Sequence, residues 1–348
     1  MIPIEAVLLG FLLIAAVAVC VMRRLLASVI IFTSFSIVMS VLWILLAAPD
    51  LAITEAAVGT GISGVLFFVV LRRIQVMEKE YREEEGRLHR RKRKPGGWRQ
   101  FLRLFYNTLS VIVCLGITSV LLFTTSKLPA FGNPGNPANN EVSKRYIEYG
   151  VQDTGAVNIV ASMILDYRAF DTFGETCVLF AAVCAILVLL RRDSPIDIFD
   201  VFLLEMEEPR QNIILKNMAF PLVAVILIFG CYVVLNGHLS PGGGFSGGAI
   251  LGAALVLYAS AYGTVRARNF INYKVYCRIV SICLAFYALA KGYSIYIGAN
   301  HIASVIPFGA PGSLLSAGMI PLLNIAVGLI VACTVYIIYI LFSKGELQ

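Results

Sequence analysis

Three ionisable side chains lie inside or at the edge of long apolar segments, where they could carry ions. Glu55 lies about one turn inside the third of these segments, Glu175 opens the fifth and Lys291 lies within the eighth. A charge in hydrocarbon costs about 2.5–3.5 kcal/mol on insertion scales, so charges kept there are functional candidates. A carboxyl group in such a low-dielectric site can take up and release protons near neutral pH. Glu55 and Glu175 are therefore predicted to belong to a proton or cation path that opens to the outer side.

Each of these side chains also has a structural interpretation. Glu55 shares a helix face with Gly59 and Ser63, which directs it toward a packed neighbour and favours the functional interpretation. Glu175 could equally be a carboxylate that is stabilised at a helix N-terminus by the helix dipole. For Lys291 we expect the side chain to extend to the outer membrane interface, in preference to a functional role.

A glycine-rich loop joins the sixth and seventh apolar segments. It contains His238 and then a proline that three glycines follow, namely Pro241, Gly242, Gly243 and Gly244. Such a run permits tight backbone with positive φ, and its amides could bind an anion or line a water-filled re-entrant path. Gly244, Gly248 and Gly252 then recur at every fourth residue, which is the small-xxx-small pattern of close helix packing.

Other motifs that resemble catalytic or cofactor sites have a structural explanation. Residues 59–64 spell GxGxxG, but they lie inside an apolar segment and are expected to let helices approach closely. The eight cysteines include no CxxC pair, and the three histidines lie outside the apolar segments, whereas iron–sulfur, zinc and haem sites need clustered thiolates or axial histidines. No Ser/His/Asp arrangement, Walker loop or HExxH motif occurs either. The sequence therefore predicts a non-catalytic chain with no metal and no cofactor.

The apolar segments themselves define the fold class. Of the 348 residues, 59% are hydrophobic and 14% charged, whereas soluble domains have about 45–50% apolar and about 25% charged residues. A bilayer core requires about 20 apolar residues in a helix, because every backbone group must be paired. The sequence predicts an all-α polytopic membrane protein with nine spans, at residues 4–22, 25–47, 51–71, 104–125, 175–190, 213–235, 247–264, 275–297 and 318–342.

The distribution of charge predicts the orientation of the spans. The net charge of +7 resides in residues 72–103, which hold 12 basic and five acidic side chains. With the N-terminus outside and the C-terminus in the cytoplasm, 23 basic residues lie on the inner side and four on the outer side, as the positive-inside rule requires. We interpret the basic segment as a solvated linker in preference to a site for anionic lipid or an acidic partner. Nucleic-acid binding is not expected, because no recognition fold accompanies the charge.

The long outer segment 127–174 has three parts. Residues 131–140 are rich in Gly, Pro and Asn and are expected to form irregular loop. Residues 154–165 are apolar and helix-like but too short to span, so a re-entrant or interfacial helix is expected. An acidic run with Asp166 and Asp171 then leads into the fifth span.

Three strings resemble domains of related membrane complexes. Residues 48–59 resemble the MbhD-like domain of membrane-bound hydrogenases, which also ends the large Mrp antiporter subunit. Residues 153–175 resemble the MbhE-type segment that follows it, and residues 236–248 with 308–311 are similar to the MrpB (MnhB) signature. The resemblance divides the chain into an MbhD-like segment at 1–75, a basic cytoplasmic loop at 76–103, an MbhE-like segment at 104–192, a cytoplasmic linker at 193–212 and an MrpB/MnhB-like segment at 213–348.

The resemblance implies a subunit of a multi-subunit Na⁺/H⁺ antiporter module, working alone as in Mrp complexes or coupled to a hydrogenase-like, complex I-related redox arm. The expected partners are antiporter-like membrane subunits, iron–sulfur subunits, Na⁺, H⁺ and the lipid of a prokaryotic cytoplasmic (inner) membrane. The acidic motif residues of the family map onto Asp50, Glu55, Asp166, Asp171 and Glu175.

One departure from the family pattern helps to choose between the Mrp-type and the hydrogenase-associated branches of the family. Asn324 stands where Mrp-type subunits tend to have an acidic residue, which favours the hydrogenase-associated branch. Two other functions remain open, a scaffold that carries no ions and a stand-alone secondary transporter. The latter is disfavoured because the two halves of the chain show no repeat. The choice between Na⁺ and H⁺ at the outer side also remains open.

Overall fold

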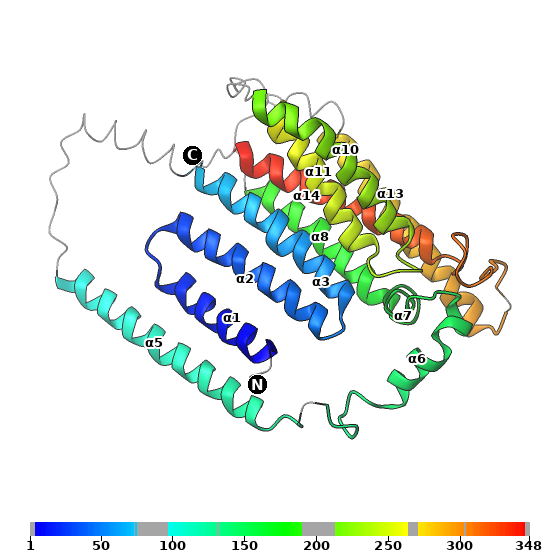
Figure 1. Ribbon diagram of the computed structural model, residues 1–348, viewed down its shortest axis with the longest axis horizontal. Coiled ribbons are helices and arrows are strands. Elements are labelled where there is room, and N and C mark those ends of the chain that lie inside the picture. Colours follow the sequence, from blue (N-terminus) through cyan, green and yellow to red (C-terminus); the bar gives the residue numbers. More distant parts are fainter. Residues whose placement is uncertain are drawn as a thin grey trace. The chain divides into compact units, whose positions relative to one another are not determined.

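In the parts of the chain that the computed structural model describes, the regular elements are all helices, joined by turns and loops (Figure 1). Most of the predicted basic loop at 76–103 and all of the predicted linker at 193–212 lie outside the described residues. The predicted all-α class is confirmed. The described residues are 4–72, 74, 97–130, 132–189, 213–263, 271–302 and 304–344.

Nine helices of the described ranges are long and apolar enough to cross a membrane, which confirms the nine predicted spans. The direction in which they cross stays a prediction. They are α1 (Ile4–Val21), α2 (Leu25–Leu45), a helix from Pro49 to Arg72 that includes α3 (Pro49–Glu55) and the π-helical η1 (Ala56–Ser63), α5 (Gly97–Ser126), α8 (Ala169–Leu189), α10 (Ile213–Leu235), α11 (Gly244–Tyr262), α13 (Tyr273–Ala299) and α14 (Ile320–Lys344). Three shorter elements are α6 (Glu141–Thr154), α7 (Ile159–Ser162) and the π-helical η2 (Met163–Tyr167).

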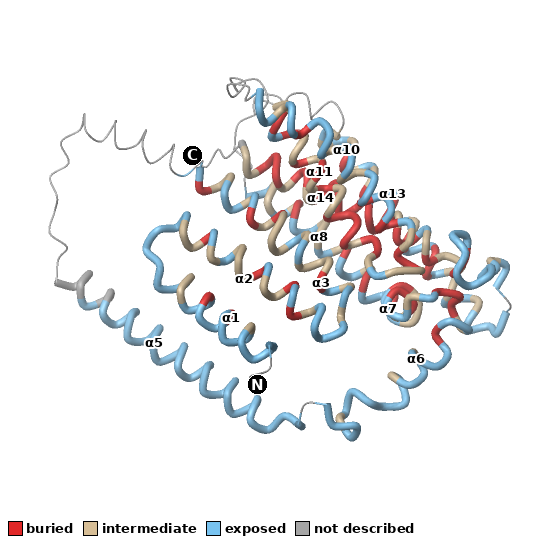
Figure 2. Tube along the Cα trace, in the orientation of Figure 1, coloured by how far each residue is buried: buried red, intermediate tan, exposed pale blue. Residues whose placement is uncertain are grey.

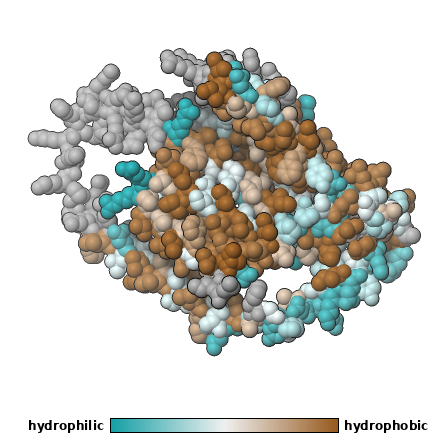
Figure 3. Space-filling model, in the orientation of Figure 1, coloured by the Kyte–Doolittle hydropathy of each residue, from teal (hydrophilic) through white to brown (hydrophobic). Residues whose placement is uncertain are grey.

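The chain forms two compact units, of which the smaller, residues 76–145, contains α5. The core of the larger unit is built by α11 and α14, whose spans are 56% and 72% buried, whereas its other spans are 11–28% buried (Figure 2). A helix that is apolar on all sides must lie either inside a bundle or against lipid. The outer helices expose apolar side chains, such as Leu13 and Ile14 of α1, and apolar side chains cover much of the visible surface (Figure 3).

The core pair packs closely because α11 presents glycines to α14. A Cβ atom added to Gly244 would lie 2.7 Å from the carbonyl oxygen of Asn324, and one added to Gly248 would lie 2.6 Å from that of Gly328. Gly252 continues the same face. The predicted small-xxx-small packing is therefore confirmed, and the backbones approach to distances that a side chain would prevent.

We expect Gly248→Ala to destabilise the protein by about 1–3 kcal/mol, because the added methyl group meets backbone that cannot rotate away. Gly292→Ala is the matched control. It lies within α13 with no atom near the added Cβ, and alanine is the better helix former. The unfolding temperature of each purified variant in mild detergent measures its stability. Equal unfolding temperatures for the two variants would contradict the close packing of α11 on α14.

Two sequence-based boundaries were wrong. The helix expected at 154–165 is interrupted, because Gly155 has a φ of +74° and a Cβ there would lie 3.0 Å from Phe308 Cβ. Asn158 then starts a new helix. The fifth span begins at Ala169 instead of Glu175. Glu175 therefore lies in the second turn of α8, where the helix dipole is weaker than at the terminus.

Candidate functional site

Asp50, at the start of α3, makes long-range contacts that join distant parts of the chain. Its Oδ1 accepts a hydrogen bond of 2.7 Å from the backbone amide of Gly242 and one of 3.5 Å from Nδ2 of Asn158. Asp50 belongs to the predicted MbhD-like segment, Asn158 to the MbhE-like segment and Gly242 to the MnhB-like segment. The three segments therefore meet at one carboxylate.

Asn158 supplies most of the hydrogen bonds at this junction. Its Nδ2 donates to the carbonyl oxygens of Gly237 and Ser240, each at 3.0 Å. Its Oδ1 accepts from the amides of Val160 and Ala161 and so caps α7. Asparagine is among the preferred N-cap residues because its oxygen can satisfy the free amides of a first turn. Here its nitrogen simultaneously holds the glycine-rich loop.

The glycine-rich loop is anchored on both of its sides. Gly242 and Gly243 have φ values of +119° and +150°, which only glycine adopts without strain. The amide of Gly244 donates to Oδ1 of Asn324 at 2.9 Å. The amides of Gly242 and Gly244 are thus already used by side chains of the same chain, and the expectation that they could bind an anion is wrong for these two groups.

His238 of this loop is fully buried. Its Nε2 lies 3.3 Å from the carbonyl oxygen of Ser313, a geometry in which Nε2 donates. The other ring nitrogen, Nδ1, has no hydrogen-bond partner among the described residues. His238 is therefore part of the packed interior of the MnhB-like segment, although the sequence places it in a loop.

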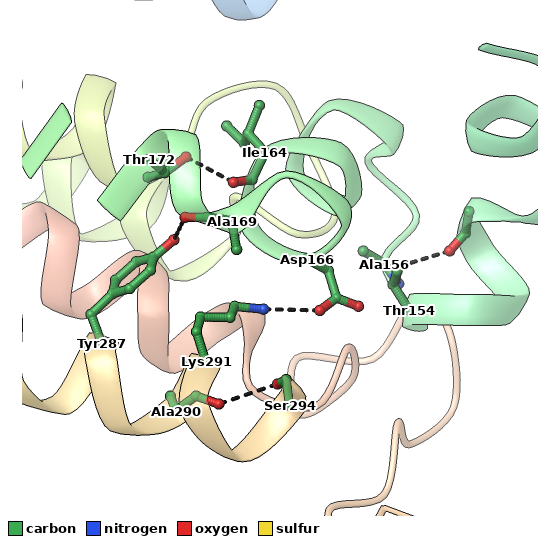
Figure 4. Close-up of polar contacts among 11 residues, drawn as sticks. Thr154, Ala156, Ile164, Asp166, Ala169, Thr172, Tyr287, Ala290, Lys291 and Ser294 are labelled. Carbon is green, nitrogen blue, oxygen red and sulfur yellow. Dashed lines mark hydrogen bonds and ion pairs between the residues drawn. The ribbon is translucent and has the colours of Figure 1, made fainter. Parts of the chain in front are cut away.

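Lys291, whose side chain is buried, forms an ion pair that the sequence did not predict. Its Nζ donates to Oδ1 of Asp166 at 2.9 Å (Figure 4). The lysine side chain is 6% exposed and that of Asp166 is 35% exposed. The expectation that Lys291 extends to the membrane interface is therefore wrong. An unpaired ammonium group in a low-dielectric interior is costly, and the aspartate in η2 compensates its charge.

Hydrogen bonds around this pair hold η2 and the start of α8 on α13. The hydroxyl of Tyr287, one turn from Lys291, donates to the carbonyl oxygen of Ala169 at 3.0 Å. The hydroxyl of Thr172 donates to the carbonyl oxygen of Ile164 at 2.7 Å (Figure 4). These bonds occupy one carbonyl group within the π-helical η2 and one just after it, where the ordinary helical pattern is broken. Such π segments occur frequently at functional sites.

Glu55 directly precedes η1, the other π-helical segment of the chain's described part, and its side chain is half-buried. A Cβ added to Gly59 would collide with Oε1 of Glu55 and would lie 2.8 Å from Oγ of Ser36. The carboxylate therefore lies over Gly59 and close to the buried Ser36 of α2, as the helix-face argument predicts. Asp166 and Glu55 share this feature: each lies in or directly beside a π-helical segment.

Asp171 and Glu175 lie on the exposed side of α8. Asp171 pairs with Arg168, and the two side chains are 56% and 60% exposed. No hydrogen bond or ion pair joins Glu175 to Glu55 within the described parts of the chain. The candidates therefore form separate groups: the Asp50 junction, the Asp166–Lys291 pair, Glu55 over Gly59, and the exposed carboxylates of α8.

Comparison with known proteins defines the class and then the family. Three family models match consecutive parts of the chain: MbhD of MBH at residues 10–76, MbhE of MBH at 108–198, and a domain related to the MnhB subunit of Na⁺/H⁺ antiporter at 214–337. An uncharacterised protein of Methanocaldococcus jannaschii is 32% identical over 188 residues, which is 49% of this chain and 71% of that protein.

Two solved structures share the fold. A chain of the Mrp complex from Dietzia sp. DQ12-45-1b superposes with a TM-score of 0.66 at 20% identity, over 98% of this chain and 35% of that chain. A chain of the membrane-bound sulfane sulfur reductase, an archaeal respiratory membrane complex, gives a TM-score of 0.54 at 26% identity, over 70% of this chain and 100% of that chain.

These findings confirm the resemblance that the motifs indicated. The chain is a multi-pass membrane subunit related to the subunits of Mrp-type antiporters. It belongs to the same family as the Methanocaldococcus jannaschii protein, and consecutive parts of it match the MbhD, MbhE and MnhB models.

Proposed function

We propose that the chain carries ions within a monovalent cation/proton antiporter module, with Na⁺ and H⁺ as the ions handled. The pair between the buried Lys291 and the partly buried Asp166 supports this proposal most strongly. A proton or cation on Asp166 would cancel the negative charge that compensates Lys291. Ion occupancy at η2 would thereby change the electrostatic energy of an ammonium group inside α13. A purely structural bundle would have no need of such a pair, because apolar side chains of similar volume pack as stably.

The remaining charged residues have different roles in this proposal. Glu55 and Glu175 belong to the ion path, since both carboxylates lie within membrane-spanning helices. Asp171 and Arg168 flank its outer end. Asp50 is an anchor for the glycine-rich loop, because a backbone amide already occupies its Oδ1.

The proposed setting is a complex in a prokaryotic cytoplasmic membrane, with the N-terminus outside. The matches to the MbhD and MbhE models and the likeness to the sulfane sulfur reductase support a redox-driven module with iron–sulfur subunits. The likeness to the Mrp complex supports further antiporter-like membrane subunits as partners. Asn324 anchors Gly244 through its amide oxygen. An asparagine at this position suits the hydrogenase-associated branch, because that branch needs no acidic side chain there.

Glu55→Gln and Glu175→Gln, made separately in the complex and reconstituted into vesicles, test the proposal. We expect each to lower cation-dependent proton transport at least fivefold, because an amide cannot take up a proton or balance a cation. Glu148→Gln, on the exposed side of α6, is the control and should transport like the wild type. Wild-type transport by both span variants would instead support a scaffold that carries no ions.

A further inference from the structure

The buried face of α13 carries polar groups at several positions, interspersed with the apolar Val280 and Ala290. Tyr276, Cys283, Tyr287 and Lys291 all lie on it, with successive spacings of seven, four and four residues, and all four are at most 8% exposed. These spacings place side chains on one side of a helix. Tyr276 and Cys283 belong to one core cluster with α14, and Tyr287 belongs to the next one. The interior of the bundle therefore holds hydroxyl, thiol and ammonium groups in a row.

Three hydroxyl groups near one end of this row are buried without hydrogen bonds. Within the described parts of the chain, Tyr276 Oη, Thr334 Oγ1 and Tyr336 Oη make no hydrogen bond of ordinary geometry, although the hydroxyl groups of Tyr276 and Thr334 lie near each other. All three residues are at most 2% exposed. A buried hydroxyl without a partner costs about 1–3 kcal/mol. Such groups, two of them in one core cluster, are therefore a place for bound water, which satisfies buried polar groups in proteins.

The three hydroxyl groups come from two helices and lie far from the ion pair. Tyr276 comes from α13 and Thr334 and Tyr336 from α14, while the neighbouring Tyr339 hydroxyl lies 2.7 Å from the hydroxyl of Ser260 in α11. Fifteen residues separate Tyr276 from Lys291, which is about 22 Å along a helix at 1.5 Å per residue. The cluster and the Lys291–Asp166 pair thus lie toward opposite ends of a membrane-spanning helix.

We propose that the hydroxyl groups of Tyr276, Thr334 and Tyr336 hold a file of water that passes protons along the interior of α13 to and from the Lys291–Asp166 pair. Each hydroxyl accepts a proton on its lone pair and releases its own proton to the next water, so each group returns to its neutral form. Cys283 and Tyr287 are the polar groups between the two ends. This inference rests on the proposed function, since it assumes that protons are among the ions that the chain carries.

Thr334 offers a sharp test, because Val has nearly its shape without the hydroxyl and Ser keeps the hydroxyl. In the reconstituted complex we expect Thr334→Val and Tyr276→Phe each to lower proton transport at least threefold, and Thr334→Ser to transport like the wild type. Tyr232→Phe on the exposed side of α10 is the control. Transport at the wild-type rate by Thr334→Val and Tyr276→Phe would overturn the relay, as would an equal loss in Thr334→Ser.

A structural readout completes the test. A high-resolution map of the intact complex should show water within hydrogen-bonding distance of the Tyr276, Thr334 and Tyr336 hydroxyls, and a dry cluster would overturn the inference. Failure of the inference is distinguishable from failure of the proposed function. If Glu55→Gln and Glu175→Gln impair transport while Tyr276→Phe does not, the proton relay is rejected and the ion-carrying role stands.

Discussion

Asp166→Ala is expected to destabilise the protein by about 2–3 kcal/mol, less than for a fully buried pair because Asp166 is 35% exposed, and to abolish transport. Removal of the carboxylate leaves the Lys291 ammonium group, whose side chain is 6% exposed, without its counter-charge. Breaking a buried pair by removing one partner is strongly destabilising, because an uncompensated charge remains. Chemical denaturation of the purified protein in detergent measures the stability, and vesicle assays of the complex measure the transport.

Asp171→Ala is the matched control for this change. It removes the same side chain five residues away, but its ion pair with Arg168 is exposed, and exposed pairs contribute only about 0–1 kcal/mol. The double variant Asp166→Ala with Lys291→Met should regain most of the lost stability, since neither charge remains. It should not regain transport. A stable Asp166→Ala single variant would show that the pair is not what keeps Lys291 in the interior.

The spans were predictable because each depends on a local property of the chain. A run of about 20 apolar residues must form a helix in lipid wherever the rest of the protein lies. The same holds for the glycines of α11, whose spacing alone indicates a close neighbour. The direction of Glu55 was also local, because residues four apart share a helix face.

The ion pair was not predictable in the same way. Lys291 and Asp166 are 125 residues apart in sequence, and Asp166 lies in a segment whose π-helical form no residue pattern indicates. Snorkelling was the better expectation for a lysine considered only with its own helix. That expectation failed because the chain turns at Gly155 and starts a new helix after Asn158. This helix leads into η2, which places Asp166 opposite α13.

The Asp50 junction was missed for a related reason. Asp50, Asn158 and Gly242 each stand in a recognisable string, yet no string shows that the three meet. One local signal was available: an asparagine directly before an apolar helix-like run is typical of an N-cap. That signal would have identified the oxygen of Asn158 but not the two carbonyl groups of the glycine-rich loop that its nitrogen binds.

Asn158→Asp is expected to free the glycine-rich loop while leaving α7 capped. Aspartate caps a helix about as well as asparagine, but its carboxylate cannot donate to the carbonyl oxygens of Gly237 and Ser240 and would repel the nearby Asp50. Two lost hydrogen bonds and this repulsion should weaken the loop by about 2 kcal/mol. Hydrogen exchange of the amides from Gly237 to Gly244 should therefore accelerate at least tenfold, because about 1.4 kcal/mol corresponds to a factor of ten.

Asn140→Asp is the matched control, because Asn140 caps α6 through its Oδ1 and the amide of Ser143. It should leave exchange in the loop unchanged. The exchanged pair Asp50→Asn with Asn158→Asp restores one amide and one carboxylate at the junction and should slow exchange again relative to Asn158→Asp alone. If Asn158→Asp left the loop amides protected, the loop would be held by packing and by its bonds to Asp50 and Asn324, without the help of Asn158. The hydrogen bonds of Asn158 would then contribute little to the loop's stability. Because they join three segments of the chain, we expect instead that they hold the loop in place.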